Sequence, residues 1–146
     1  MFFIAGIYMW VEDSPAYTVT NANLFQLVEN DINTYQQLGR VYLTGDWNAR
    51  VGKKLDFIIH DRNINGIGDY AFEPDFQCYR NTMDTTSNSQ GQQLIDLCIL
   101  TGLILANERL ENDLQGSFTY TNYMGSSVID FLMANENDFI LLQNFT

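Results

Sequence analysis

The segment from residue 41 to residue 50, Val41-Tyr42-Leu43-Thr44-Gly45-Asp46-Trp47-Asn48-Ala49-Arg50, is an apolar run that ends at a glycine and continues with an acid and an amide two positions apart. In an extended segment, side chains at positions i and i+2 leave the same face, so we expect Asp46 and Asn48 to project together and Trp47 to point the other way. A carboxylate can hold a hard cation or take a proton from water, and a carboxamide can donate to a phosphate oxygen. The pattern favours a phosphodiester site; the alternative is an ordinary strand-ending turn, since Gly, Asp and Asn all form turns.

The residues before this segment predict a β-α-β unit. Residues 2–10 form an apolar first strand, and the next polar residues form a loop. Between Asn21 and Leu38 the apolar positions recur at helical spacing, with Thr20 or Asn21 available as the cap and Gly39 as the stop. Such a unit places its strands parallel in one sheet, so the loop of Asp46 lies at the carboxyl end of a strand, where open α/β sheets bind ligands.

The second half of the chain contains a long polar segment, one helix and three predicted strands. Residues 53–87 are rich in Asn, Asp and Gly and predict a surface excursion. A helix is expected from Asn88 or Ser89 to Gly102, and residues 103–107 form a buried strand after it. Residues 117–121 and 127–133 predict two adjacent strands, antiparallel to each other.

Asp130 interrupts the last of these apolar strands. A carboxylate is costly to bury without a partner, so it requires one. Two interpretations remain open at this point: a functional acid, or an acid satisfied by backbone amides.

Composition indicates one globular domain of 146 residues, with 46% hydrophobic and 14% aromatic residues and no run long enough to cross a bilayer. The apolar start, residues 1–10, lacks a basic flank and a cleavage site, so it predicts a buried strand rather than a signal peptide. Two cysteines, Cys78 and Cys98, are too few to indicate an oxidising compartment, and both are expected to be reduced thiols. We therefore expect an intracellular protein, nuclear or cytoplasmic, without membrane contact.

The formal net charge of −11 weighs against a free-standing nucleic-acid binder. The basic residues are unevenly distributed, however, because five of the seven fall between positions 40 and 62, against three acids there. The loop of Asp46 is thus the least repulsive place for a polyanion. A solvated loop that happens to be basic is the equally open alternative.

Taken in order, these segments resemble the endonuclease/exonuclease/phosphatase superfamily, which has the DNase I-like fold. The chain is most similar to the endonuclease domains that accompany reverse transcriptases in non-LTR (LINE-type) retrotransposons. Residues 45–52, Gly-Asp-Trp-Asn-Ala-Arg-Val-Gly, resemble the signature Gly-Asp-Phe-Asn-Ala-Arg-x-Gly, and Ile7-Tyr8 resembles the end of the tyrosine-bearing strand. The helix at residues 88–98 with Gly102-Leu103 and Ala106-Asn107, and the segments Phe118-Thr119-Tyr120 and Ile129-Asp130-Phe131-Leu132, complete the likeness.

The resemblance implies hydrolysis of a phosphodiester, with DNA as partner and Mg²⁺ or Mn²⁺ as cofactor. It assigns Asp46 to the acid that orients or deprotonates the attacking water and contacts the metal. Asn48 and Tyr8 correspond to the residues that steady the scissile phosphate, and Asp130 to the aspartate that orients a catalytic histidine. The one histidine, His60, lies in the wrong place for that role, and we expect it to be a surface or structural residue.

The resemblance covers residues 1–146 as a partial domain. The fold class expected is an incomplete α/β sandwich of the DNase I type, the C-terminal half without the early strands and without the terminal Ser-Asp-His segment. Metal binding is then weak, and the activity of the chain alone is impaired or absent. An uncovered apolar sheet face favours self-association or pairing with a complementary domain half. The alternatives are a catalytically dead remnant that acts as an interaction module, and a phosphatase branch of the same superfamily.

Overall fold

The computed structural model describes residues 1–20, 23–58 and 79–142 and shows an α/β protein with mixed helices and strands. Asp46 lies at the end of the second strand and Asp130 at the start of the sixth. The elements, in chain order, are β1 (Phe2–Tyr8), α1 (Pro15–Thr20), α2 (Leu24–Gln36), β2 (Arg40–Asp46), α3 (Ser89–Thr101), β3 (Ile104–Leu105), η2 (Glu111–Asp113), β4 (Tyr120–Asn122), β5 (Gly125–Ser127), β6 (Asp130–Ala134), η3 (Glu136–Asp138) and α4 (Phe139–Leu142).

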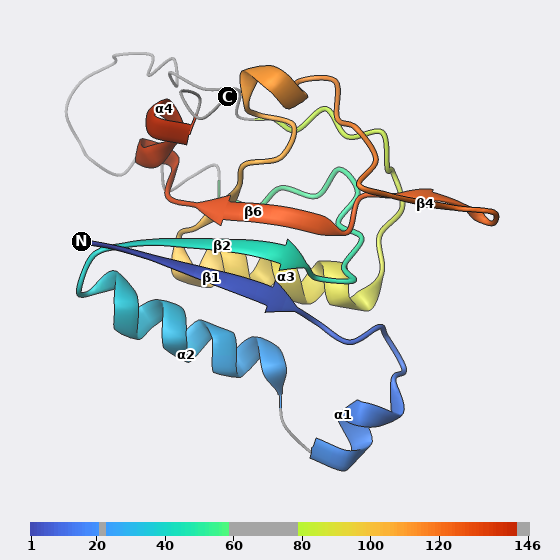
Figure 1. Cartoon of the computed structure of the whole chain (residues 1–146), viewed down its shortest axis with the longest axis horizontal. Coiled ribbons are helices and arrows are strands. Elements are labelled where there is room, and N and C mark those ends of the chain that lie inside the picture. Colours follow the sequence, from blue (N-terminus) through green and yellow to red (C-terminus); the bar gives the residue numbers. More distant parts are fainter. Residues whose placement is uncertain (21–22, 59–78, 143–146) are drawn as a thin grey trace.

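The main sheet has the strand order β1-β2-β6-β3. Strands β1 and β2 are parallel, and β6 runs antiparallel to both of its neighbours. Helices α2 and α3 lie on one face of this sheet and the short α4 on the other, as Figure 1 shows. The hairpin of β4 and β5 projects from the end of the sheet at which β1 and β2 terminate and β6 begins (Figure 1).

The predicted β-α-β unit is confirmed, with small differences at its ends. The first strand ends at Tyr8 rather than at residue 10, and the short helix α1 occupies positions for which no helix was predicted. The cap of α2 is Asn23, not Thr20 or Asn21, because the Asn23 side chain accepts from the Gln26 backbone N–H at 3.2 Å.

The prediction for α3 is also confirmed. Asn88 caps its N-terminus, and Gly102 ends it in the left-handed conformation, with a φ of 72°. The strand that follows, β3, contains only two residues instead of the five predicted at 103–107.

The predicted antiparallel pairing of the last strands is confirmed where Tyr120 lies opposite Ser127, but the predicted bounds are wrong. Residues 127–133 do not form one strand, since β5 ends at Ser127 and β6 begins at Asp130. Strand β4 pairs with β5 in a separate two-stranded hairpin, whereas β6 enters the main sheet between β2 and β3. The described parts of the predicted excursion, 53–58 and 79–87, contain no strand beyond the bridge from Val51 to Ser87.

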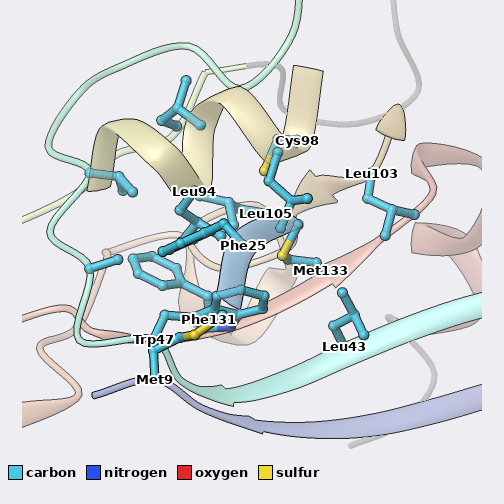
Figure 2. Close-up of a cluster of buried hydrophobic side chains, with 14 of the residues drawn as sticks. Met9, Phe25, Leu43, Trp47, Leu94, Cys98, Leu103, Leu105, Phe131 and Met133 are labelled. Carbon is cyan, nitrogen blue, oxygen red and sulfur yellow. The ribbon is translucent and has the colours of Figure 1, made fainter. Parts of the chain in front are cut away.

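The main core lies between the sheet and helices α2 and α3. Trp47 is 0% exposed and points into this core, as predicted, where it lies near Met9 and Phe131 at the end of the sheet (Figure 2). Cys98 of α3 is a free buried thiol, as expected, and Cys78 and His60 lie outside the described residues. A smaller apolar cluster covers part of the opposite face and includes Phe139 of α4.

Two buried ion pairs attach the irregular segments to the core. Arg109 donates to both carboxylate oxygens of Asp56, at 2.6 and 2.7 Å, and Arg80 pairs with Glu108 at 3.1 Å. Burial raises the pKa of Asp56, but the hydrogen bonds and charge of Arg109 outweigh it and leave this pKa below its ordinary value. Separating the two partners of such a pair would leave an uncompensated buried charge, which is strongly destabilising. The two pairs therefore hold the irregular segments in place against the core.

The indole N–H of Trp47 has no hydrogen-bond partner among the described residues, although the side chain is fully buried. We therefore predict that Trp47→Phe changes the free energy of unfolding by less than about 1.5 kcal/mol, because the lost contacts are offset by removal of an unsatisfied donor. Trp47→Ala, in contrast, is expected to cost about 3–5 kcal/mol through the cavity it leaves. Urea unfolding of the two variants measures the difference, and equal losses would contradict the prediction.

Candidate functional site

Three of the predicted site residues lie in one row across the sheet. Tyr8 at the end of β1 is directly opposite Asp46 at the end of β2, and Asp46 is directly opposite Asp130 at the start of β6. Residues directly opposite each other on neighbouring strands project from the same face. The row thus brings a phenol and two carboxylates together on the face opposite the buried Trp47.

Asn48 joins this row through a turn and not through the extended geometry that we predicted. Strand β2 ends at Asp46, and Asn48 adopts a left-handed conformation with a φ of 47°. Its backbone N–H donates to the Asp46 carboxylate at 2.9 Å, and its carboxamide donates to the Met9 carbonyl oxygen at 2.8 Å. Asn48 therefore lies beside Asp46 and also holds the residue that follows β1.

Gly45 allows the strands to approach this closely. Its φ is 143°, and a Cβ atom at this position would overlap the Ile7 carbonyl oxygen of β1. Only glycine accommodates both the backbone conformation and the contact. The glycine of the Gly-Asp-x-Asn motif is thus required one position before the acid.

The surroundings of Asp46 shift the pKa of its carboxyl group. Burial raises the pKa of Asp46, the Asn48 backbone N–H lowers it, and the nearby charge of Asp130 raises it again, so the net pKa lies above the ordinary value. The Asp130 carboxylate accepts no hydrogen bond from the described residues. The interpretation that backbone N–H groups bind the Asp130 carboxylate is therefore not supported by the described residues.

The backbone of Asp130 is held by two side chains that the sequence analysis did not single out for this role. The Thr119 hydroxyl accepts from the N–H groups of Ile129 and Asp130, both at 3.1 Å. The Asn107 carboxamide donates to the Asp130 carbonyl oxygen at 3.0 Å and accepts from the Leu132 N–H at 2.9 Å. The motifs Phe118-Thr119-Tyr120 and Ala106-Asn107 contain these two residues, and the family likeness was the available signal.

The residues of the row suit a single divalent cation held weakly. Mg²⁺ in proteins is commonly held by one or two carboxylates together with water molecules and substrate phosphates. Asp46 and Asp130 supply two adjacent carboxylates, and a bound cation would reduce the repulsion between their negative charges. Within the described ranges, however, no group of three or more His, Cys, Asp or Glu residues could hold an ion.

Much of the positive charge predicted near Asp46 is neutralised. Arg40 pairs with Asp138 at 3.2 Å, and Arg50 forms two hydrogen bonds to Asp84, at 2.9 and 2.7 Å. Lys54 donates to the Gln92 side chain at 2.6 Å, and Lys53 is exposed. Of the basic residues between positions 40 and 58, only the two lysines are thus outside an ion pair.

The hairpin of β4 and β5 carries exposed apolar side chains next to this end of the sheet. Tyr123 at its tip is 96% exposed, and the adjacent Met124 is also exposed. The hairpin leads directly into β6, whose first residue is Asp130. An exposed aromatic side chain therefore lies on the element that precedes the row.

Comparison with known proteins found no matching family model, no matching curated protein and no matching solved structure. Within the described ranges, none of the helices has the length and apolar character needed to span a bilayer.

Asp46→Asn is expected to stabilise the protein at pH 7 by about 0.2–1 kcal/mol, the range of cross-strand pair energies, because it removes the like-charge contact with Asp130. Folding raises the pKa of Asp46 above its ordinary value of 3.8. The contribution of Asp46 to the free energy of unfolding therefore becomes less favourable as the pH rises above 3.8. The advantage of the variant should consequently shrink as the pH is lowered toward 3.8.

Chemical denaturation at several pH values measures this difference. Asp31→Asn, an exposed change on α2, is the control for the general effect of removing one negative charge. A variant at Asp46 that is no more stable than this control at pH 7 would contradict the prediction.

Proposed function

We propose that the row of Tyr8, Asp46 and Asp130, together with Asn48, is the phosphodiester-cleaving site of a DNase I-like fold. In this proposal the chain is a metal-dependent endonuclease domain of the kind found in non-LTR retrotransposons, acting on DNA with Mg²⁺ or Mn²⁺. The observation that carries it is the lateral register, which brings three of the four residues assigned by family resemblance onto one face. The comparisons add no support from a relative, so the proposal rests on the motifs and on this geometry.

Each side chain of the row fits a role in phosphodiester hydrolysis. Asp46, with its raised pKa, is suited to orient a water molecule and accept its proton. Asn48 uses one carboxamide N–H on Met9 and has a second N–H to offer a phosphate oxygen. Tyr8, which is exposed, can donate its hydroxyl to the same phosphate. A bound divalent cation would supply charge stabilisation for the transferring phosphoryl group.

The proposed activity of the chain by itself is weak. By resemblance Asp130 orients a histidine, but no hydrogen-bond donor reaches its carboxylate from the described residues. Two carboxylates also hold Mg²⁺ weakly, as we expected from the sequence. In this proposal the water-activating acid and the phosphate-binding groups come from the described residues, and no histidine lies among them.

The projecting hairpin favours a nucleic acid over a small phosphoester as the substrate. Tyr123 and Tyr120 are exposed on an element that borders the row, and exposed aromatic rings can stack on bases. A site for a small soluble phosphoester does not need a hairpin with exposed aromatic side chains beside it. The phosphatase branch remains the alternative that a substrate comparison would reveal.

A plasmid-nicking assay with Mn²⁺, with and without added imidazole, tests the proposed activity. We expect slow nicking that imidazole stimulates at least several-fold, since general acid–base groups contribute about 10²–10⁴-fold in enzymes and a free imidazole recovers part of this. The stimulated activity should disappear in Asp46→Ala and persist in Asp31→Asn. Nicking that is unaffected by Asp46→Ala, or no nicking under any of these conditions, would overturn the proposal.

A second candidate function, interaction with another copy of this chain, is favoured by the exposed surface of β1. Phe2 and Ile4 are each 67% exposed on the same face as Tyr8, and no described strand pairs with the outer edge of β1. On the other side of this strand, a groove of about 430 Å³ lies between β1 and α2 and is lined by apolar side chains such as Phe3 and Val28. An uncharged edge strand with apolar side chains on both faces can pair with an identical strand about a two-fold axis.

Ile4→Lys is expected to abolish this self-association, because an edge lysine blocks strand-to-strand pairing. Sedimentation equilibrium should show a concentration-dependent dimer for the wild type and a monomer for the variant. Leu100→Lys, an equally exposed change on α3, is the control and should leave the dimer intact. A wild-type monomer at all concentrations, or a dimer that survives Ile4→Lys, would exclude this candidate.

A further inference from the structure

We infer that Asn88 is a positioning residue for the proposed site, because it binds the loop of Asn48 as well as capping α3. The inference rests on the proposed function for the meaning of that loop. The contact itself joins two residues, Asn88 and Asn48, that lie 40 positions apart in the sequence.

Asn88 makes three hydrogen bonds to the loop. Its carboxamide donates to the Asn48 carbonyl oxygen at 3.2 Å, and its side-chain oxygen accepts from the Arg50 N–H at 2.9 Å. Its own backbone N–H donates to the Arg50 carbonyl oxygen at 3.0 Å. Both main-chain polar groups of Arg50 and the carbonyl group of Asn48 are therefore satisfied by one residue.

The same side chain also caps α3. The oxygen that accepts from Arg50 accepts from the Gly91 N–H at 2.7 Å, so a single atom joins the helix N-terminus to the loop. Gly91 allows this approach, because a Cβ atom there would overlap the Arg50 carbonyl oxygen. Two independent features of the α3 N-terminus, a bridging carboxamide and a glycine at the contact, are thus fitted to the loop.

Through its bond to the Asn48 carbonyl oxygen, Asn88 helps to hold Asn48 in its left-handed conformation. The left-handed backbone of Asn48 costs free energy and persists only where the surroundings impose it. In that conformation its N–H reaches Asp46 and its carboxamide reaches Met9, which joins the ends of β2 and β1. Asn88 acts through Asn48 on the position of Asp46 and does not itself reach the row.

A matched pair of cap substitutions separates this role from simple helix capping. Serine is as good an N-cap as asparagine but is too short to bridge to the loop. Asn88→Ser therefore keeps the cap and the backbone bond to the Arg50 carbonyl oxygen, and removes the side-chain contacts with Asn48 and Arg50. Asn23→Ser makes the same change at α2, where the cap oxygen accepts only from Gln26. Hydrogen exchange of the backbone amides, followed by NMR without metal or DNA, is the measurement.

We expect the amides of Asn48 and Arg50 to exchange about tenfold faster or more in Asn88→Ser and to be unchanged in Asn23→Ser. A milder variant, Asn88→Asp, keeps the acceptor for Arg50 and loses the donor to Asn48, so its effect should be concentrated at Asn48. Exchange at Asn48 that stays within about twofold of the wild type in both Asn88 variants would overturn the inference.

The activity measurement distinguishes this inference from the proposed function. In Asn88→Ser the imidazole-stimulated nicking should fall about tenfold without a change in DNA affinity, whereas Asn23→Ser should retain it. An unchanged nicking rate in Asn88→Ser would overturn the positioning role. A wild-type chain that does not nick would count against the proposed function alone, because the exchange experiment needs neither metal nor substrate.

Discussion

The lateral pairing of β2 with β1 on one side and β6 on the other is the constraint on which the site depends. It places Tyr8, Asp46 and Asp130 in one row, although they are separated by most of the chain. The pairing requires Gly45, since any side chain there would overlap the backbone of β1. A shift of one residue in the register would move one member of the row to the core face, where Trp47 and Phe131 pack.

The end of the sheet that carries the row is not optimised for stability. Asp46 lies opposite a like charge, Asn48 is held in a left-handed conformation, and the buried indole N–H of Trp47 lacks a partner among the described residues. Such features cluster at functional sites, where they are maintained by the surrounding structure. The buried pair of Asp56 and Arg109 is a different case, because each of its charges is compensated.

Local signals predicted much of the fold, and long-range contacts limited the rest. The β-α-β unit and α3 were predictable because helical periodicity and the residues Asn88 and Gly102 mark them in the sequence. The hairpin of β4 and β5 was predicted with the wrong bounds because its turn, Tyr123-Met124, lacks the usual Asn-Gly signal. The position of β6 was not predicted because it depends on distant strands. The roles of Asn88 and Asn107 depend on contacts across 23 to 40 positions, which a single sequence does not reveal.

The most direct test of the account is paramagnetic line broadening by Mn²⁺, observed residue by residue in the NMR spectrum of this chain. If the register creates one shared site, the amide signals of Tyr8, Asp46 and Asp130 should broaden together over the same range of Mn²⁺ concentration, and Asp46→Asn should weaken all three effects. Broadening of only one of these residues, or broadening of all three that survives in Asp46→Asn, would contradict a site built across the three strands.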